Sequence, residues 1–286
     1  MIHPAEISVH AFLRSAIEGK SSMSEEVIQQ VATDVAAALN KQFNSGPRDQ
    51  FRLRMSNIGR PRCQLWFAKN DPDHDCEKPT SFMLNMLMGD WTEAIFKGVL
   101  RAAGVSFDDN ADVTLQVGDT TIKGEYDMVL DGAMDDVKST TPYGYDQKFS
   151  SFEDLTRKDD FGYVAQLVGY AKAANKKVGG WWVINKVNGE FKYVSAETAN
   201  VDEIMESIKG TVDYINNDEP FKRCFDAEPE TFRKKPSGNM KLHKTCGWCD
   251  YRKKCWPELQ EIDSKVYTGG KAPPQVKYVY LKEENK

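Results

Sequence analysis

Four cysteines are split between the two ends of this chain, and their spacing constrains its fold more than any other feature of the sequence. Cys63 lies near the start, whereas Cys246, Cys249 and Cys255 lie within one ten-residue stretch near the end. Four thiolates are enough to hold a tetrahedral zinc ion or an iron–sulfur cluster, and the spacing alone does not distinguish between the two. We therefore expect the two ends to meet at one four-cysteine site; free buried cysteines are the alternative.

The composition indicates a soluble globular protein with a buried core. The 286 residues are 40% hydrophobic, but no apolar run approaches the roughly 18 residues of a membrane span, and the first residues do not form a secretory signal. We expect a cytoplasmic protein, in which clustered cysteines bind metal rather than form disulfides. Cys76 and Cys224 are assigned no function, and His74 beside Cys76 is interpreted as a chance neighbour rather than a second zinc site.

Helical and strand patterns alternate along the chain and predict an α/β fold, a mixed β-sheet flanked by helices. Residues 25–43 place apolar side chains at helical spacing after Ser24, a suitable N-cap. Asp131-Gly132 predicts a tight turn between two strands. The other expected elements are a short helix starting near Cys63, helices at 82–103, 160–174 and 198–217, strands at 113–117, 121–130 and 134–139, and a hairpin of 181–186 with 191–195. Residues 271–286 are predicted to be a poorly ordered tail.

Two carboxylates and a lysine form the candidate catalytic group. Asp127 lies among apolar neighbours in a predicted strand, where a carboxylate needs compensation. Asp136 and Lys138 are two residues apart in the next strand, so their side chains point to the same face of the sheet. Two carboxylates holding Mg²⁺ or Mn²⁺ beside an ammonium group could hydrolyse a phosphodiester. Asp135 would point away from Lys138, so we favour Asp136 as the ligand; a surface ion pair is the alternative interpretation.

Two further motifs flank these strands and complete a resemblance to a known family. The helix before the sheet contains Gly89-x-x-x-Glu93, and the helix after it contains Gln166-x-x-x-Tyr170. Together with the two aspartates and the lysine, these motifs resemble those of the PD-(D/E)XK nucleases, in particular the RecB-like branch. The resemblance implies a restriction-endonuclease-like core in which Glu93 is a metal ligand, where many relatives have histidine. It also implies that Gln166 and Tyr170 position DNA or the catalytic lysine.

The arrangement of the cysteines narrows this resemblance to iron–sulfur nucleases, namely CRISPR-associated exonucleases and the nuclease domains of AddB-type helicase-nucleases. The resemblance implies that Cys63, Cys246, Cys249 and Cys255 hold a [4Fe-4S] cluster that joins the ends of the domain. It covers about residues 55–257. We accordingly expect an N-terminal helical extension at 1–50, a nuclease domain at 51–257 and a C-terminal tail at 258–286.

The expected function is a metal-dependent deoxyribonuclease, an exonuclease acting on single-stranded DNA ends in recombination, repair or replication. The chain contains no phosphate-binding glycine-rich loop, so we expect it to act alone or beside a helicase or recombination partner. The net charge of -5 disfavours a nucleic-acid partner, but basic residues gather near the cysteines. These include Arg60, Arg62, Lys244, Arg252, Lys253 and Lys254. An RNA nuclease would have the same residues, and a non-catalytic DNA-binding module with a structural zinc or iron–sulfur site is the alternative from a different class.

Overall fold

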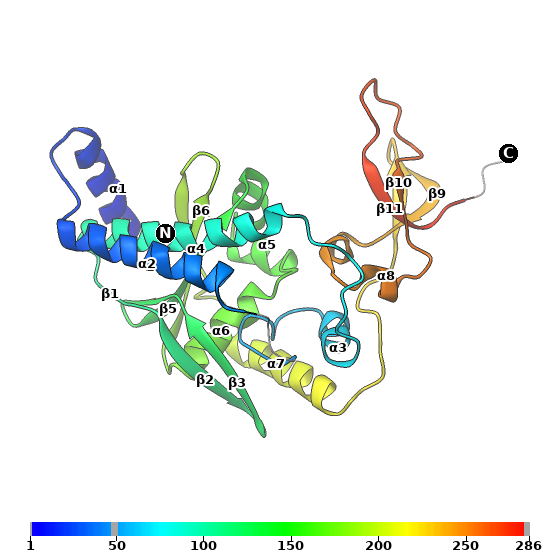
Figure 1. The fold of residues 1–286 in the computed structure, drawn as a ribbon, viewed down its shortest axis with the longest axis horizontal. Helices are drawn as coiled ribbons and strands as arrows, with labels where there is room; N and C mark the ends of the chain where they lie inside the picture. Colours follow the sequence, from blue (N-terminus) through cyan, green and yellow to red (C-terminus); the bar gives the residue numbers. More distant parts are fainter. Residues whose placement is uncertain (1, 47–50, 283–286) are drawn as a thin grey trace. The chain divides into compact units, whose positions relative to one another are not determined.

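The computed structural model describes residues 2–46 and 51–282, which form two compact units (Figure 1). The first unit comprises Met1–Gly59 and Pro79–Asp213, and the second comprises Arg60–Lys78 and Tyr214–Lys286. Both units contain helices and strands, so the expected mixed α/β class is confirmed. The domain boundary expected at residue 50 lies outside the described residues.

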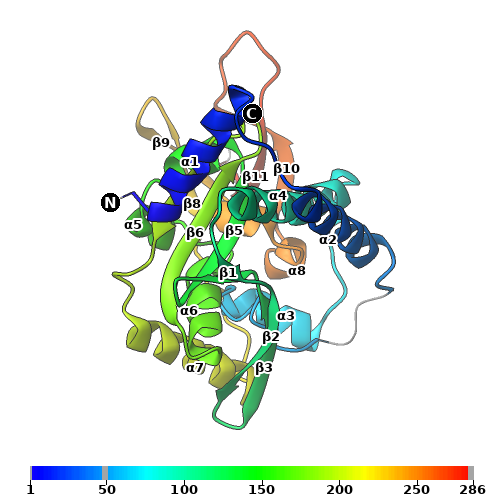
Figure 2. The same cartoon turned by 90° about the vertical axis from the view of Figure 1, so that its left-hand side faces the viewer.

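A five-stranded sheet forms the centre of the first unit. Its strands, in spatial order, are β1 (Phe107–Asp108), β4 (Met128–Leu130), β5 (Ala133–Thr140), β6 (Lys177–Asn185) and β7 (Phe191–Ser195). The central strands β5 and β6 run parallel and lie side by side in Figure 2, whereas the other neighbours are antiparallel. Asp131 and Gly132 have positive φ angles of 50° and 76°, which is the backbone conformation required by the predicted tight turn.

The strand predicted at 121–130 is divided in two, and Asp127 lies at the division. β3 (Thr120–Tyr126) pairs with β2 (Ala111–Val117) in a separate two-stranded sheet, whereas β4 belongs to the five-stranded sheet. The backbone bends at Asp127 as the chain passes from one sheet to the other. One continuous strand is therefore the wrong prediction here, because no glycine or proline at this position signals the bend.

Helices α1 (Pro4–Ile17) and α4 (Ser81–Ala102) cover one face of the sheet, and α2 (Glu25–Phe43) runs alongside α4 (Figure 1). Helix α1 was not expected from the sequence, although His3 caps it and Pro4 occupies its first turn. The apolar cluster under these helices consists of Ala5, Val9, Phe96, Leu100, Met128, Leu130, Val137 and Trp182. The N-terminal extension therefore contributes directly to the core of the first unit.

Helix α6 (Tyr163–Ala173) covers the opposite face of β5. Val137 belongs to the cluster under α4, whereas the next residue, Lys138, lies over the ring of Tyr163. Gly162 has a φ angle of 77° and approaches Gly59 so closely that a Cβ on either residue would collide with the other's backbone. The remaining helical segments of the first unit are η1 (Gly144–Lys148), α5 (Phe152–Arg157) and most of α7 (Val201–Asn216). No helix within residues 2–46 and 51–282 is long and apolar enough to cross a membrane.

The second unit combines α3 (Arg62–Asn70) and two short helical segments, η2 (Lys244–Trp248) and α8 (Arg252–Cys255), with an antiparallel sheet. The strands of this sheet, in spatial order, are β10 (Gln260–Asp263), β11 (Gln275–Tyr280), β9 (Lys235–Lys241) and β8 (Glu228–Phe232). The prediction of a poorly ordered tail is wrong for residues 275–280, which form β11. Tyr278 on this strand is fully buried and donates a 2.6 Å hydrogen bond to Glu230.

Candidate active site and cysteine site

Asp136 and Lys138 lie on the same face of β5 and bond to each other. Lys138 Nζ donates to Asp136 Oδ1 at 2.6 Å and lies 2.5 Å from Oδ2. The Asp136 side chain is almost fully buried, and its Oδ2 accepts no hydrogen bond of ordinary geometry from the described residues. Burial raises the pKa of Asp136, although Lys138 opposes this effect. Burial alone would lower the pKa of Lys138, but Asp136 and Asp127 together raise it above its ordinary value.

Asp127 faces this pair from the bend between β3 and β4. Its Oδ2 accepts a 2.9 Å hydrogen bond from the backbone N–H of Val137, which ties the bend to β5. Burial raises the pKa of Asp127 to about 8, and the carboxylates of Asp136 and Glu93 add to this increase. The two aspartates are therefore close enough that each disfavours the charge of the other.

Asp135, on the other face of β5, is occupied by structural hydrogen bonds. Its carboxylate accepts hydrogen bonds from the Tyr193 hydroxyl at 2.8 Å, the Gly180 N–H at 2.9 Å and the Trp182 indole at 3.1 Å. Burial raises its pKa to about 7. The structure thus places Asp136, and not Asp135, beside Lys138, as strand alternation predicts.

Glu93 on α4 is held by two residues that the sequence analysis did not include. Lys97 Nζ donates to Glu93 Oε1 at 2.7 Å, and Asn110 Nδ2 donates to the same oxygen at 3.1 Å. Burial alone would raise the pKa of Glu93, but Lys97 and Asn110 lower it below its ordinary value. Lys97 is only 2% exposed, so this ion pair is shielded from water. The four-residue spacing of Glu93 and Lys97 was the available signal for their contact.

Helix α6 places Gln166 and Tyr170 on the side that faces the carboxylates. The side chain of Gln166 hydrogen-bonds to Tyr170, and burial raises the pKa of Tyr170 to about 12. Asp127 and Asp136 contribute to this increase, which shows that they lie near the tyrosine. The Tyr170 ring packs against Gly124 of β3, where a Cβ would come within 2.8 Å of Tyr170 Cε1. The six residues expected at the site therefore share one neighbourhood.

The carboxylates of this neighbourhood are bonded to ammonium groups rather than arranged around a common point. Lys138 occupies the space next to Asp136, and Lys97 occupies the space next to Glu93. Across the described part of the chain, no group of three or more His, Cys, Asp or Glu side chains is positioned to hold a metal ion. The metal-binding roles of Glu93, Asp127 and Asp136 stay predictions, and so do those of the four cysteines, to which the same finding applies.

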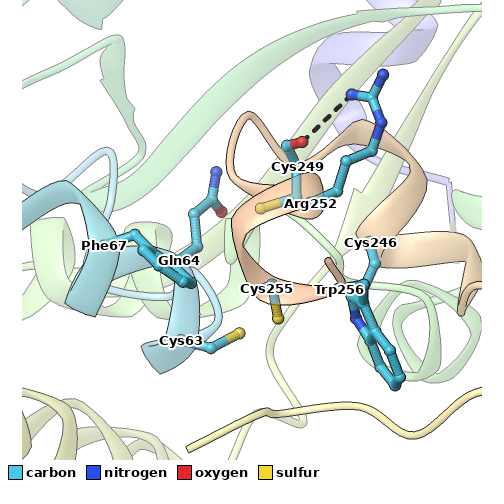
Figure 3. Close-up of a pocket in the computed structure, with 8 residues that line it drawn as sticks. All are labelled: Cys63, Gln64, Phe67, Cys246, Cys249, Arg252, Cys255 and Trp256. Atoms are coloured by element: carbon cyan, nitrogen blue, oxygen red, sulfur yellow. Dashed lines mark hydrogen bonds between the residues drawn. The ribbon is translucent and has the colours of Figure 1, made fainter. Parts of the chain in front are cut away.

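The four expected cysteines line one small cavity in the second unit (Figure 3). Cys63 comes from the first turn of α3, Cys246 from η2, and Cys255 from the end of α8, while Cys249 follows η2 directly. The cavity has a volume of about 20 Å³, and Gln64, Phe67, Arg252 and Trp256 complete its lining. In Figure 3 the sulfur atoms of Cys63 and Cys255 point into the space between α3 and the later segment.

The cysteine thiols strongly favour their protonated form. Burial raises the pKa of Cys246 to about 12 and that of Cys249 to about 11, and neighbouring cysteines add to both increases. Burial also raises the pKa of Cys255. A hydrogen bond to Cys224, together with burial, raises the pKa of Cys63. A bound cation would compensate the thiolate charges, so metal binding here would release protons.

Cys224, which the sequence analysis assigned no function, lies beside Cys63. Its Sγ accepts a 3.1 Å hydrogen bond from the Cys63 backbone N–H. Cys224 also makes a small contribution to the raised pKa of Cys246 and of Cys255, although it does not line their cavity. No local pattern signals these contacts, because Cys63 and Cys224 are 161 residues apart. Cys76, in contrast, donates to Asp75 Oδ1 at 2.8 Å.

The basic residues near the cysteines are partly neutralised. Lys254 Nζ lies 2.5 Å from Asp71 Oδ1, and Arg252 Nε lies 3.0 Å from Glu261 Oε1. Lys244 and Lys253 are exposed and form no ion pair within the described ranges. The net positive charge near the cysteines is therefore smaller than the sequence suggests.

Comparisons with known proteins add only a distant structural likeness. No family model and no curated protein matches the chain. A solved structure described as "Crystal structure of SSO0001" is similar over 80% of this chain and 96% of that one, with 11% sequence identity and a TM-score of 0.41.

Proposed function

We propose that this chain is a metal-dependent deoxyribonuclease of the PD-(D/E)XK type with a restriction-endonuclease-like core, and that it acts as an exonuclease on single-stranded DNA ends. The observation that carries the proposal is the group formed by Asp127, Asp136 and Lys138. Removing two carboxylates and an ammonium group from water opposes folding, so such clusters are enriched at sites that use the charges. The mixed sheet with helices on both faces supports the proposed core.

The donor atoms of this group suit a hard divalent cation. Asp136 Oδ2 is buried and, among the described residues, has only Lys138 Nζ beside it, at 2.5 Å. Burial and the neighbouring carboxylates of Asp136 and Glu93 raise the pKa of Asp127 despite the charge of Lys138. Carboxylate oxygens are the ligands that Mg²⁺ and Mn²⁺ prefer. Asp127 and Asp136 would hold the cation, with Glu93 as the third ligand. A cation bound there would supply Lewis-acid chemistry, polarising the phosphodiester and lowering the pKa of a water.

Lys138 supplies positive charge beside the reacting groups. Because its pKa is raised, Lys138 keeps its proton at neutral pH and donates hydrogen bonds. It can therefore orient the nucleophile and stabilise negative charge that develops on the phosphate. The ring of Tyr163, with its centroid 5.2 Å from Nζ, favours the charged form from the α6 side. Gln166 and Tyr170 lie on the same helix as Tyr163 and position DNA or the lysine.

The cysteine site supports the proposal because a bound cluster would link two segments of the second unit that are far apart in the sequence. We propose that Cys63, Cys246, Cys249 and Cys255 hold a [4Fe-4S] cluster, since four soft sulfur ligands around one cavity suit iron–sulfur chemistry or zinc. Closing the loop between Cys63 and Cys246 costs on the order of 4 to 5 kcal/mol of chain entropy, which the ligand bonds would offset. The exposed Lys244 and Lys253 suit contacts with DNA phosphates.

The decisive experiment measures cleavage of end-labelled single-stranded DNA with Mg²⁺ or Mn²⁺, with excess chelator and with Ca²⁺. We expect cleavage with the first two ions, none with chelator, and binding with little cleavage in Ca²⁺. Asp136→Asn should abolish cleavage. Asp119→Asn is the matched control, because Asp119 is an exposed aspartate in the β2–β3 turn of the same unit.

Three outcomes separate the proposal from its competitors. Chelator-resistant cleavage would exclude the metal-dependent mechanism. DNA binding without cleavage under any metal would favour the non-catalytic DNA-binding module. Cleavage of labelled RNA in preference to DNA would reassign the substrate while retaining the site.

A further inference from the structure

A fifth sulfur, that of Cys224, lies beside Cys63 but does not line the cavity of the cysteine site. Cys224 Sγ accepts the Cys63 N–H at 3.1 Å, and the Cys63 thiol hydrogen-bonds to the same sulfur. The Arg62 N–H also bonds to Cys224. These N–H groups belong to the first turn of α3, whose N-cap residue, Pro61, provides no side-chain cap. Cys224 therefore satisfies backbone donors that would otherwise lack a partner.

Arg223, the residue before Cys224, binds the segment that carries Cys255. The Arg223 guanidinium donates two hydrogen bonds to the Cys255 carbonyl oxygen, at 2.9 Å from Nε and 2.6 Å from Nη2. It also stacks over the Trp256 ring, 3.8 Å from the centroid. Cys224 is consequently held between α3 and α8, the two segments that supply Cys63 and Cys255. Its placement follows from these contacts rather than from chance proximity.

Three properties make Cys224 suitable as a metal ligand. Its sulfur accepts hydrogen bonds from backbone N–H groups, and such donors orient and stabilise a metal-bound thiolate. It is also exposed, whereas Cys63 is buried, so solvent and incoming metal reach Cys224 first. In addition, the loop from Cys224 to Cys246 is much shorter than the loop from Cys63, so closing it loses less chain entropy.

We propose that Cys224 is an exchangeable ligand sulfur of the cysteine site, able to take the position of Cys63. The site then has five thiols for four ligand positions, and Cys63 and Cys224 share one of them. This inference rests on the proposed metal-binding role of the cysteines but does not depend on nuclease activity.

The test loads the full-length protein anaerobically with ferrous iron and sulfide, or separately with Zn²⁺, and measures bound metal per chain. Cys63→Ser and Cys224→Ser should each keep most of the wild-type metal. The double variant should bind metal at least about tenfold more weakly, because losing only a hydrogen-bond partner of a metal ligand already costs about that much. Cys76→Ser is the matched control, because Cys76 lies in the same unit but bonds to Asp75.

Alkylation by iodoacetamide followed by peptide mapping tests the exchange without relying on the double variant. In the metal-loaded wild type, Cys224 should be modified, whereas in metal-loaded Cys63→Ser it should be protected. Equal metal loss in Cys63→Ser and the double variant, or unprotected Cys224 in loaded Cys63→Ser, would overturn the exchange. A wild type that binds neither iron nor zinc would instead overturn the cysteine site itself. Nuclease activity in that protein would show that the proposed reaction survives.

Discussion

Replacing Asp127 by asparagine should stabilise the metal-free protein while it abolishes catalysis. The pKa of Asp127 rises from 3.8 to about 8 in the folded protein. An acid with a higher pKa in the folded state binds its proton more tightly there than in the unfolded chain. The resulting destabilisation is absent below pH 3.8 and grows as the pH rises towards 8. Asparagine carries no charge at any of these pH values and can still accept the Val137 N–H.

The expected gain follows from the size of this pKa difference. Each pKa unit corresponds to about 1.4 kcal/mol. The interval between the ordinary pKa of 3.8 and pH 7, over which Asp127 holds its proton only in the folded state, therefore destabilises the folded protein by about 4 kcal/mol at pH 7. Asp127 is only partly buried, and water screens part of this free energy, so we expect Asp127→Asn to gain about 2 kcal/mol at pH 7. At pH 5 the gain should fall below about 1 kcal/mol.

The assay is urea unfolding in the presence of chelator at pH 5 and pH 7, with Asp119→Asn as the exposed control. Adding Mg²⁺ should then stabilise the wild type but not Asp127→Asn, because only the wild type retains the proposed ligand. Equal destabilisation of Asp127→Asn at both pH values would refute the argument, since it would show that no unfavourable charge resides at this position.

Four further predictions follow from the two sites. Lys138→Ala should lose on the order of 100-fold or more in single-turnover cleavage rate with little change in DNA affinity; a near-normal rate would contradict its placement. Lys244→Gln combined with Lys253→Gln should weaken single-stranded DNA binding and reduce the salt slope by about 1.4, while the cleavage rate of saturated complexes is unchanged. Lys97→Met should destabilise the protein by about 3 to 5 kcal/mol in urea unfolding, because it leaves the Glu93 charge without its ammonium partner; adding Glu93→Gln should restore much of the loss. Protein purified without oxygen should contain iron and absorb broadly near the blue edge of the visible spectrum, and stoichiometric zinc without iron would contradict the proposed cluster.

The sequence alone determined the features that depend on local geometry. Strand alternation places Asp136 and Lys138 on one face and Asp135 on the other, because successive side chains of a strand point in opposite directions. Asp131-Gly132 predicts its turn because few other residue pairs adopt positive φ at both positions. The four-residue spacing of Gln166 and Tyr170 likewise places both side chains on one face of α6.

Only the tertiary structure decided the contacts between distant segments. Asp127 lies at a bend because β3 and β4 pair with different sheets, and strand pairing depends on partners elsewhere in the chain. Asn110 reaches Glu93 from outside α4. Cys224 joins the cysteine site through Cys63, 161 residues away. The physical reason is the range of the interactions: backbone conformation and side-chain direction follow from near neighbours, whereas burial, charge pairing and the meeting of thiols depend on how the whole chain packs.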